Sequence, residues 1–113
     1  MAGRSFDSKG ERDRGTTLSL MERAKEIRDL EFQVRVHLTC QVYWRLDYKY
    51  FDLKKNVWVY EDFKGIETEA YRIKRKLWAG FGPAFLRISK RTHGGGITVV
   101  EEHLPGTTAE RYD

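Results

Sequence analysis

Two neighbouring stretches, residues 42–51 and 57–63, are apolar and rich in aromatic side chains. Short runs of this composition bounded by polar residues are typical of β-strands. The polar segment between the two stretches has the length and composition of a hairpin connection. If residues 53–56 form a four-residue loop, Asp52 lies opposite Val57, and the register of the whole hairpin follows.

This register brings like charges together. It places Asp47 opposite Asp62, and Arg45 opposite Lys64. Directly opposed residues on one face of a hairpin have Cβ atoms about 5 Å apart, and two like charges in that arrangement destabilise the pairing. A cation between the two aspartates would remove the repulsion. The hairpin therefore raises the question of a catalytic metal site.

The residues before the hairpin predict one helix and one strand. Residues 9–28 have helical periodicity, and Ser8 and Glu11 have the spacing of a capping box at the start of the helix. Residues 31–38 alternate between apolar and polar and predict a strand. The expected apolar stripe of the helix consists of Leu20, Met21, Ala24 and Ile27.

The residues after the hairpin predict a second helix and one or two further strands. Thr68 is expected to cap a helix that runs to about Ala79. Residues 84–89 predict a short strand, which a strand–helix–strand connection places parallel to residues 57–63. Residues 97–100 are a candidate edge strand. The side of the second helix expected to be buried carries Ala70, Ile73, Leu77 and Trp78.

These elements define an α/β fold in the order α-β-β-β-α-β, with a mixed sheet flanked by two helices. A chain of 113 residues is long enough for one hydrophobic core and too short for two domains. We therefore expect a single domain over residues 1–113. The polar stretches at residues 1–5 and 101–113 are predicted to be flexible ends.

Composition excludes some classes of protein. No apolar run approaches the roughly 18 residues of a membrane helix, and the N-terminal residues lack the apolar core of a signal peptide. Cys40 is the single cysteine, so neither an intrachain disulfide nor a cysteine-based zinc site is expected. A cytoplasmic protein without membrane association is the resulting expectation. The net charge of +4 permits a polyanionic partner without requiring one.

The candidate chemistry lies in the pattern D-x14-D-x-K formed by Asp47, Asp62 and Lys64, with Glu11 as a third carboxylate. Hard divalent cations such as Mg²⁺ bind one or two carboxylates together with water and substrate phosphate. Such an ion polarises a phosphodiester and lowers the pKa of a bound water. A neighbouring lysine can position that water or stabilise charge on the phosphoryl group.

Four blocks of the chain resemble a family of small phage-borne nucleases in the PD-(D/E)XK superfamily: FDSKGERDR, EIRDLEFQ, YWRLDYKYFD and VWVYEDFKGIETEAYRIKRKLW. The resemblance covers roughly residues 6–78, and the EDFKG-x-x-T-x-x-Y-x-x-K block is its most specific part. It implies a restriction-endonuclease-like fold and Mg²⁺-dependent cleavage of DNA, with Mn²⁺ expected to substitute. Some members of the superfamily are Holliday-junction resolvases.

The resemblance also implies roles for individual residues. Glu11 corresponds to a helix-borne glutamate of the metal site, Asp47 to the central metal ligand and Asp62 to the second ligand, and Lys64 to the lysine that assists the attacking water. No proline precedes Asp47, where the superfamily's name places one; Leu46 stands there instead.

Two of these assignments have structural alternatives. Glu11 can serve as a helix cap rather than as a metal-site residue. The basic cluster of the second helix can contact DNA or form an ordinary solvated face. Glu61 is expected to lie on the opposite face from Asp62, either packed or solvated. The basic cluster consists of Arg72, Lys74, Arg75 and Lys76.

The function expected from the sequence is a Mg²⁺-dependent DNA endonuclease that acts on duplex or branched DNA. One such site cuts one strand, so symmetric cleavage of a duplex or a junction requires a homodimer. The first alternative is a DNA-binding accessory protein that has the fold without the activity. The second is an enzyme of the same fold that acts on RNA.

Overall fold

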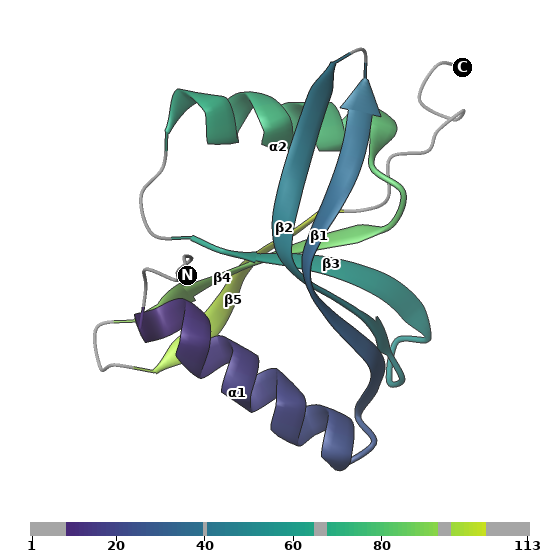
Figure 1. Cartoon of the computed structure of the whole chain (residues 1–113), viewed down its shortest axis with the longest axis vertical. Coiled ribbons are helices and arrows are strands. Elements are labelled where there is room, and N and C mark those ends of the chain that lie inside the picture. The colour runs from purple at the N-terminus through teal and green to yellow at the C-terminus, as the bar shows by residue number, and fades with distance from the viewer. Residues whose placement is uncertain (1–8, 40, 65–67, 93–95, 104–113) are drawn as a thin grey trace.

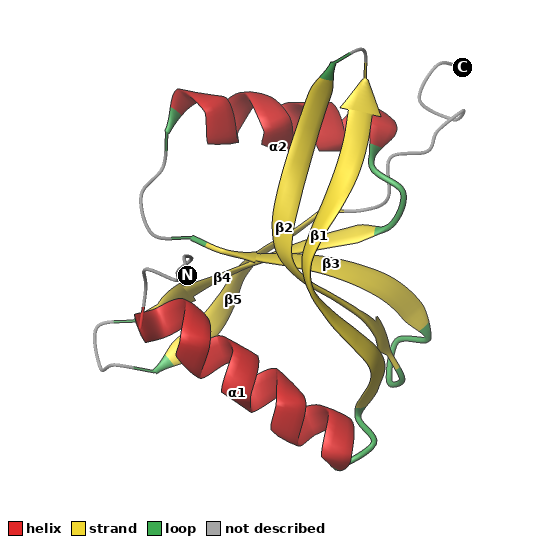
Figure 2. Ribbon diagram, viewed as in Figure 1, coloured by secondary structure: helices red, strands yellow, loops and turns green. Residues whose placement is uncertain are grey.

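The computed structural model describes residues 9–39, 41–64, 68–92 and 96–103. It is an α/β fold in which two helices flank one five-stranded mixed sheet, and the predicted order of elements is confirmed (Figures 1 and 2). The predicted capping residue Ser8 and the flexible ends at 1–5 and 104–113 lie outside the described residues. The elements are α1 (Lys9–Arg23), β1 (Ile27–Thr39), β2 (Val42–Asp52), β3 (Val57–Phe63), α2 (Glu69–Phe81), β4 (Phe85–Arg91) and β5 (Ile97–His103).

The strands follow one another across the sheet in chain order, and β3 and β4 are the parallel pair, as predicted. The hairpin register is also confirmed, because β2 and β3 pair from Asp52 and Val57 as far as Tyr48 and Glu61. The pairing stops there, so the expected alignment of Arg45 with Lys64 is not part of it. The Lys64 N–H instead donates to the carbonyl of Ser89 on β4, at 2.8 Å.

The first helix is shorter than its periodicity predicts, and the following strand is longer. Lys25 has a left-handed backbone (φ of 63°), and the Lys25 and Glu26 N–H groups donate to carbonyls of the last helical turns. This Schellman arrangement ends α1 at Arg23 without the glycine that usually signals it. Ile27 is consequently a buried residue of β1 rather than part of a helical stripe.

The buried side of α1 also differs from the expected stripe. Leu18 is fully buried, whereas Leu20 is 57% exposed. The helix presents its two glycines to the sheet, and a Cβ on Gly10 would lie 2.4 Å from Cζ of Phe63. Gly10 therefore permits a close approach of α1 to the end of β3 that no other residue allows.

The second helix has the predicted cap but a different buried side. The Thr68 hydroxyl accepts from the Tyr71 N–H at 3.1 Å, and the helix continues past Ala79 to Phe81. Trp78 is fully buried, as expected, but Ala70 and Ile73 are exposed, and Tyr71 packs against the core in their place.

Two apolar clusters join the sheet to its helices, and β1 contacts both helices. One cluster lies under α2 around Trp78, which meets Trp44 and Tyr60 edge to face. The other lies under α1 around Leu18 and Tyr48. In Figure 1 the two helices lie at opposite ends of the β1–β2 hairpin, so the hairpin spans the molecule between them.

The last strand is longer than expected. β5 extends to His103, so residues 101–103 belong to the sheet rather than to a polar tail. Neither described helix has the length and apolar character needed to cross a bilayer.

A buried ion pair fastens α1 to the middle of the sheet. Arg14 on α1 donates to both carboxylate oxygens of Glu61 on β3, at 2.6 and 3.1 Å, and the Glu61 side chain is fully buried. The Tyr50 hydroxyl donates to the same carboxylate at 2.5 Å and accepts from Arg87 at 3.2 Å. Arg87 then donates to Asp52 at 2.7 Å, so the charges are paired within one network.

Removing one partner of this pair leaves an uncompensated buried charge. We expect Arg14→Ala to lower the free energy of unfolding by about 3–5 kcal/mol, as measured by urea denaturation. Arg12→Ala is the matched control, because Arg12 is exposed on the same helix, and it should change stability by less than about 0.5 kcal/mol. A loss below about 1 kcal/mol for Arg14→Ala would show that the pair does not hold α1 in place.

Candidate functional site

Asp47 and Asp62 lie together just beyond the last paired residues of β2 and β3, as the hairpin register predicts. The Asp47 N–H donates to Oδ1 of Asp62 at 3.3 Å. The Phe63 N–H donates to Oδ2 of Asp47 at 2.8 Å. Each carboxylate is therefore oriented by main chain of the opposite strand, and the two acidic groups share one small volume.

Burial disfavours the doubly charged form of this aspartate pair, because it raises the pKa of both carboxyl groups. Burial, reinforced by the negative charge of Asp62, raises the pKa of Asp47 from 3.8 to about 7, and the Phe63 N–H only partly opposes the shift. The pKa of Asp62 is also raised, first by burial and then by the charges of Glu11 and Glu61. A cation beside the two carboxylates would favour their charged forms and offset the repulsion.

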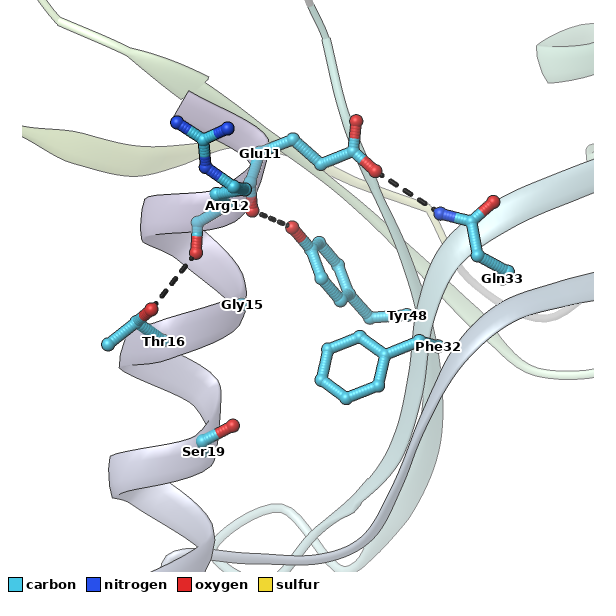
Figure 3. A pocket seen from close by; sticks show the side chains of 8 residues that line it. All are labelled: Glu11, Arg12, Gly15, Thr16, Ser19, Phe32, Gln33 and Tyr48. Atoms are coloured by element: carbon cyan, nitrogen blue, oxygen red, sulfur yellow. Dashed lines mark hydrogen bonds between the residues drawn. The ribbon is translucent and has the colours of Figure 1, made fainter. Parts of the chain in front are cut away.

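Glu11 reaches the pair from the first turn of α1. Its Oε2 accepts from Nε2 of Gln33 at 3.2 Å (Figure 3), and its negative charge contributes to the raised pKa of Asp62. The Tyr48 hydroxyl donates to the main-chain carbonyl of Glu11. The Glu11 carboxylate is thus directed at the sheet and at the aspartates, which is the position that its candidate role requires.

The position of Glu11 follows from its neighbours on α1. Arg14, one turn further along the helix, is held by Glu61, which directly precedes Asp62 on β3. Glu61 is therefore a packed structural residue, one of the two alternatives expected from the sequence. The same two helix–strand contacts, Arg14 to Glu61 and Gly10 to Phe63, hold the start of α1 at the end of β3.

Gln33 was not predicted as a site residue. It lies between the pairs Phe32–Tyr48 and Val34–Leu46, and therefore opposite Asp47. Its φ of 56° is left-handed, a conformation that is uncommon outside glycine and costs free energy. Glutamine carries no local preference for this conformation, so the sequence gives no signal for it.

At Gln33 and Asp47 the β1–β2 hairpin passes from packing against α1 to packing against α2. On β2, Tyr48 belongs to the cluster under α1, and Leu46 belongs to the cluster under α2. The change occurs between these two residues, at Asp47. The acidic site therefore lies at the boundary between the apolar cluster under α1 and the apolar cluster under α2.

Lys64 is placed next to the site but toward α2. Its ammonium lies 5.6 Å from the centroid of the Tyr71 ring, and the guanidinium of Arg75 lies 5.2 Å from the same ring. The structure thus brings Glu11, Asp47 and Asp62 together and packs Lys64 beside them against α2.

The predicted basic cluster on α2 is partly solvated. Arg72 and Lys76 are exposed, whereas Lys74 and Arg75 are half-buried. The two exposed members are the side chains of this cluster that a phosphate backbone can reach most directly.

A second row of cations lies on the sheet and was not predicted. Lys49 lies 5.0 Å from the Trp58 ring and 5.5 Å from the Tyr60 ring, and Arg28 lies 4.2 Å from the Phe51 ring. The hairpin register puts Lys49 and Tyr60 on the face that carries the two aspartates. Cations and aromatic rings interleaved in this way suit a nucleic-acid strand.

The donor chemistry of the site fits a hard divalent cation. Within the part of the chain that the structure describes, no three or more His, Cys, Asp or Glu residues form a group that could hold a metal ion. Two carboxylates with water and substrate oxygens suffice for Mg²⁺ or Mn²⁺, however. Asp47 and Asp62 are such a pair, and a cation beside them would favour the charged forms that burial disfavours.

Comparison with known proteins identifies no family for this chain: no family model matches it, and no curated protein or solved structure is significantly similar.

The raised pKa values predict an unusual dependence of stability on pH. Between pH 4 and 7 the folded protein binds more protons at this pair than the unfolded chain, so the free energy of unfolding should fall as pH rises. Asp47→Asn removes one of the two charges and should raise stability at pH 7.5 by roughly 1–3 kcal/mol, measured by urea denaturation without divalent cations.

Two further measurements complete this test. Glu26→Gln makes the same acid-to-amide change at an exposed position and should leave the pH profile unchanged. Mg²⁺ in the millimolar range should raise the melting temperature of the wild type at pH 7.5 and should have little effect on Asp47→Asn. Identical pH profiles for the wild type and Asp47→Asn would contradict the raised pKa.

Proposed function

We propose that the protein is a Mg²⁺-dependent DNA endonuclease with a restriction-endonuclease-like fold of the PD-(D/E)XK type. The observation that carries the proposal is the buried Asp47–Asp62 pair beside Glu11, at the end of a strand that leads into a helix with exposed basic residues. The element order α-β-β-β-α-β-β and the parallel pairing of β3 with β4 support the same fold.

The residues of the chain have separable roles in this proposal. Asp47 and Asp62 hold the metal ion, which when bound polarises the phosphodiester and lowers the pKa of the attacking water. Main-chain N–H groups of both strands orient the two carboxylates before the substrate arrives. Glu11, fixed by Gln33, adds negative charge at the same place. Hydrolysis by in-line attack of water leaves a 5′-phosphate.

Lys64 is assigned to the charge that develops on the phosphoryl oxygens. It follows Asp62 by two residues, directly after the end of β3, where its N–H still donates to Ser89 of β4. The long lysine stem lets its ammonium move from the Tyr71 ring toward a bound phosphate. A lysine in this position stabilises the transition state more than the ground state, which is the condition for catalysis.

DNA is expected to lie across α2 and the outer face of the hairpin. Arg72 and Lys76 supply charge on one side of the carboxylates, and Lys49 and Arg28 supply it on the other. Electrostatic contacts of this kind bring the backbone to the site without reading its sequence. A homodimer would place two such sites on the two strands of a duplex or junction.

A DNA-binding accessory protein is the second candidate. The observation that favours it is the position of the candidate catalytic lysine, Lys64, whose ammonium lies 5.6 Å from the centroid of the Tyr71 ring on α2. The two candidates differ in one measurable property, because only the nuclease cuts DNA in the presence of Mg²⁺.

The nuclease assay uses Mg²⁺ with labelled duplex, single-stranded and four-way-junction DNA, and with RNA of matched sequence. We expect cleavage of DNA that EDTA abolishes. Asp62→Asn and Lys64→Ala should each lower kcat at least about 100-fold, because one removes a metal ligand and the other a positive charge at the phosphate.

Matched controls separate chemistry from general damage. Lys54→Ala removes an exposed lysine from the hairpin loop, and Glu26→Gln changes an exposed carboxylate. Both variants should keep wild-type rates. Cleavage that survives in both Asp62→Asn and Lys64→Ala would refute the assignment, whereas DNA binding without any cutting would favour the accessory protein. Cutting confined to RNA would keep the site and change the substrate.

The basic face of α2 is tested by the salt dependence of binding. The double variant Arg72→Ala/Lys76→Ala should weaken DNA binding and lower the slope of log K against log salt by about 1–2, because each phosphate contact releases about one counterion. Fluorescence anisotropy without divalent cations measures both quantities.

The control for this measurement is Arg23→Ala/Lys25→Ala, which removes two exposed charges at the end of α1 distant in sequence from α2. An equal loss of slope in the two double variants would mean that net charge, and not the face of α2, determines binding.

A further inference from the structure

A pocket of about 400 Å³ lies between α1 and the β1–β2 hairpin, and it adjoins the acidic site (Figure 3). Its volume falls within the roughly 300–1,000 Å³ typical of small-molecule sites. Glu11 and Gln33 belong both to the pocket and to the candidate site. The pocket is lined by Glu11, Arg12, Gly15, Thr16, Ser19, Phe32, Gln33 and Tyr48.

One wall of the pocket is aromatic and open. Phe32 is 53% exposed, although it lies on a strand, and its ring meets Tyr48 edge to face at 5.8 Å between centroids. Gly15 of α1 packs close to one edge of the Phe32 ring, where a Cβ would lie 3.4 Å from it. The exposed part of the Phe32 ring is the apolar surface that a flat ligand can contact.

The rim of the pocket is polar and nearly neutral. The hydroxyls of Thr16 and Ser19 lie on the α1 side, and the Gln33 amide lies on the sheet side, where it donates to Glu11 (Figure 3). The lining carries one negative and one positive side chain, Glu11 and Arg12, so their formal charges cancel. The lining therefore suits an uncharged ring with hydrogen-bonding edges.

We propose that this pocket receives an unpaired nucleobase of the DNA strand that is cut, which adds a substrate class to the proposed function and rests on it. A base bound against Phe32 leaves its own phosphates outside, toward Asp47 and Asp62. Bases stack on aromatic side chains and hydrogen-bond through their edges. In a regular duplex the bases are paired and stacked, so the site serves DNA with an extruded or unpaired nucleotide next to the cleaved phosphate.

Two variants test the pocket from opposite walls. Phe32→Ala removes the aromatic surface, and Thr16→Tyr fills the space from the exposed side of α1. Thr17→Tyr is the matched control for the second variant, because Thr17 is the next exposed residue of the same helix and does not line the pocket. Circular dichroism and thermal melting verify that the three variants fold.

The measurement is fluorescence anisotropy in EDTA with three labelled duplexes of the same length. One is fully paired, one carries a single unpaired adenine, and one carries an abasic residue at the same place. We expect the wild type to bind the unpaired adenine about tenfold more tightly than either other duplex. Phe32→Ala and Thr16→Tyr should lose this preference, and Thr17→Tyr should retain it.

The pocket and the nuclease activity can fail independently. No preference in the wild type, or a preference that survives in Phe32→Ala and Thr16→Tyr, overturns the pocket even if Mg²⁺-dependent cleavage is found. A preference that both variants abolish supports the pocket as a base-binding site even if no cleavage is detected, in which case the nuclease function fails alone.

Discussion

The ion pair between Arg14 and Glu61 is the interaction on which the arrangement of this protein depends. A fully buried carboxylate is tolerated only if its charge is paired and its oxygens are hydrogen-bonded. Arg14 donates to both oxygens, and Tyr50 donates to Oε1 while its hydroxyl accepts from Arg87. Because Arg14 belongs to α1 and Glu61 to the centre of the sheet, satisfying this one group determines where the helix lies.

The position of the candidate site follows from the ion pair between Arg14 and Glu61. Glu61 and Asp62 are adjacent on β3, and Arg14 lies one turn from Glu11 on α1, so pairing the structural residues brings the acidic ones together. The environment of Glu61 differs from that of the pair formed by Asp47 and Asp62. Glu61 has its arginine, whereas Asp47 and Asp62 are oriented by main-chain donors, and burial raises the pKa of both carboxyl groups. Carboxyl groups with pKa values raised in this way are typical of sites of binding or chemistry.

The surface around this pair is consistent with a strand of nucleic acid. Exposed arginine and lysine of α2 lie beyond one side of it, a row of cations on aromatic rings lies along the hairpin, and an aromatic pocket opens beside Glu11. Charge attracts a phosphate backbone over the whole face, but only the pocket offers a contact to a base. The distinction matters because backbone contacts provide affinity, whereas a base contact provides selectivity.

Local rules in the sequence determined the hairpin register, the Thr68 cap and the parallel β4, because alternation, loop length and capping act over a few residues. They therefore placed Asp47 beside Asp62. Tertiary structure alone decided the left-handed backbone at Gln33, the exposure of Phe32 and Ile73, and the pairing of Arg14 with Glu61. Each of these depends on partners distant in the chain, and neither periodicity nor composition contains information about which distant surfaces meet.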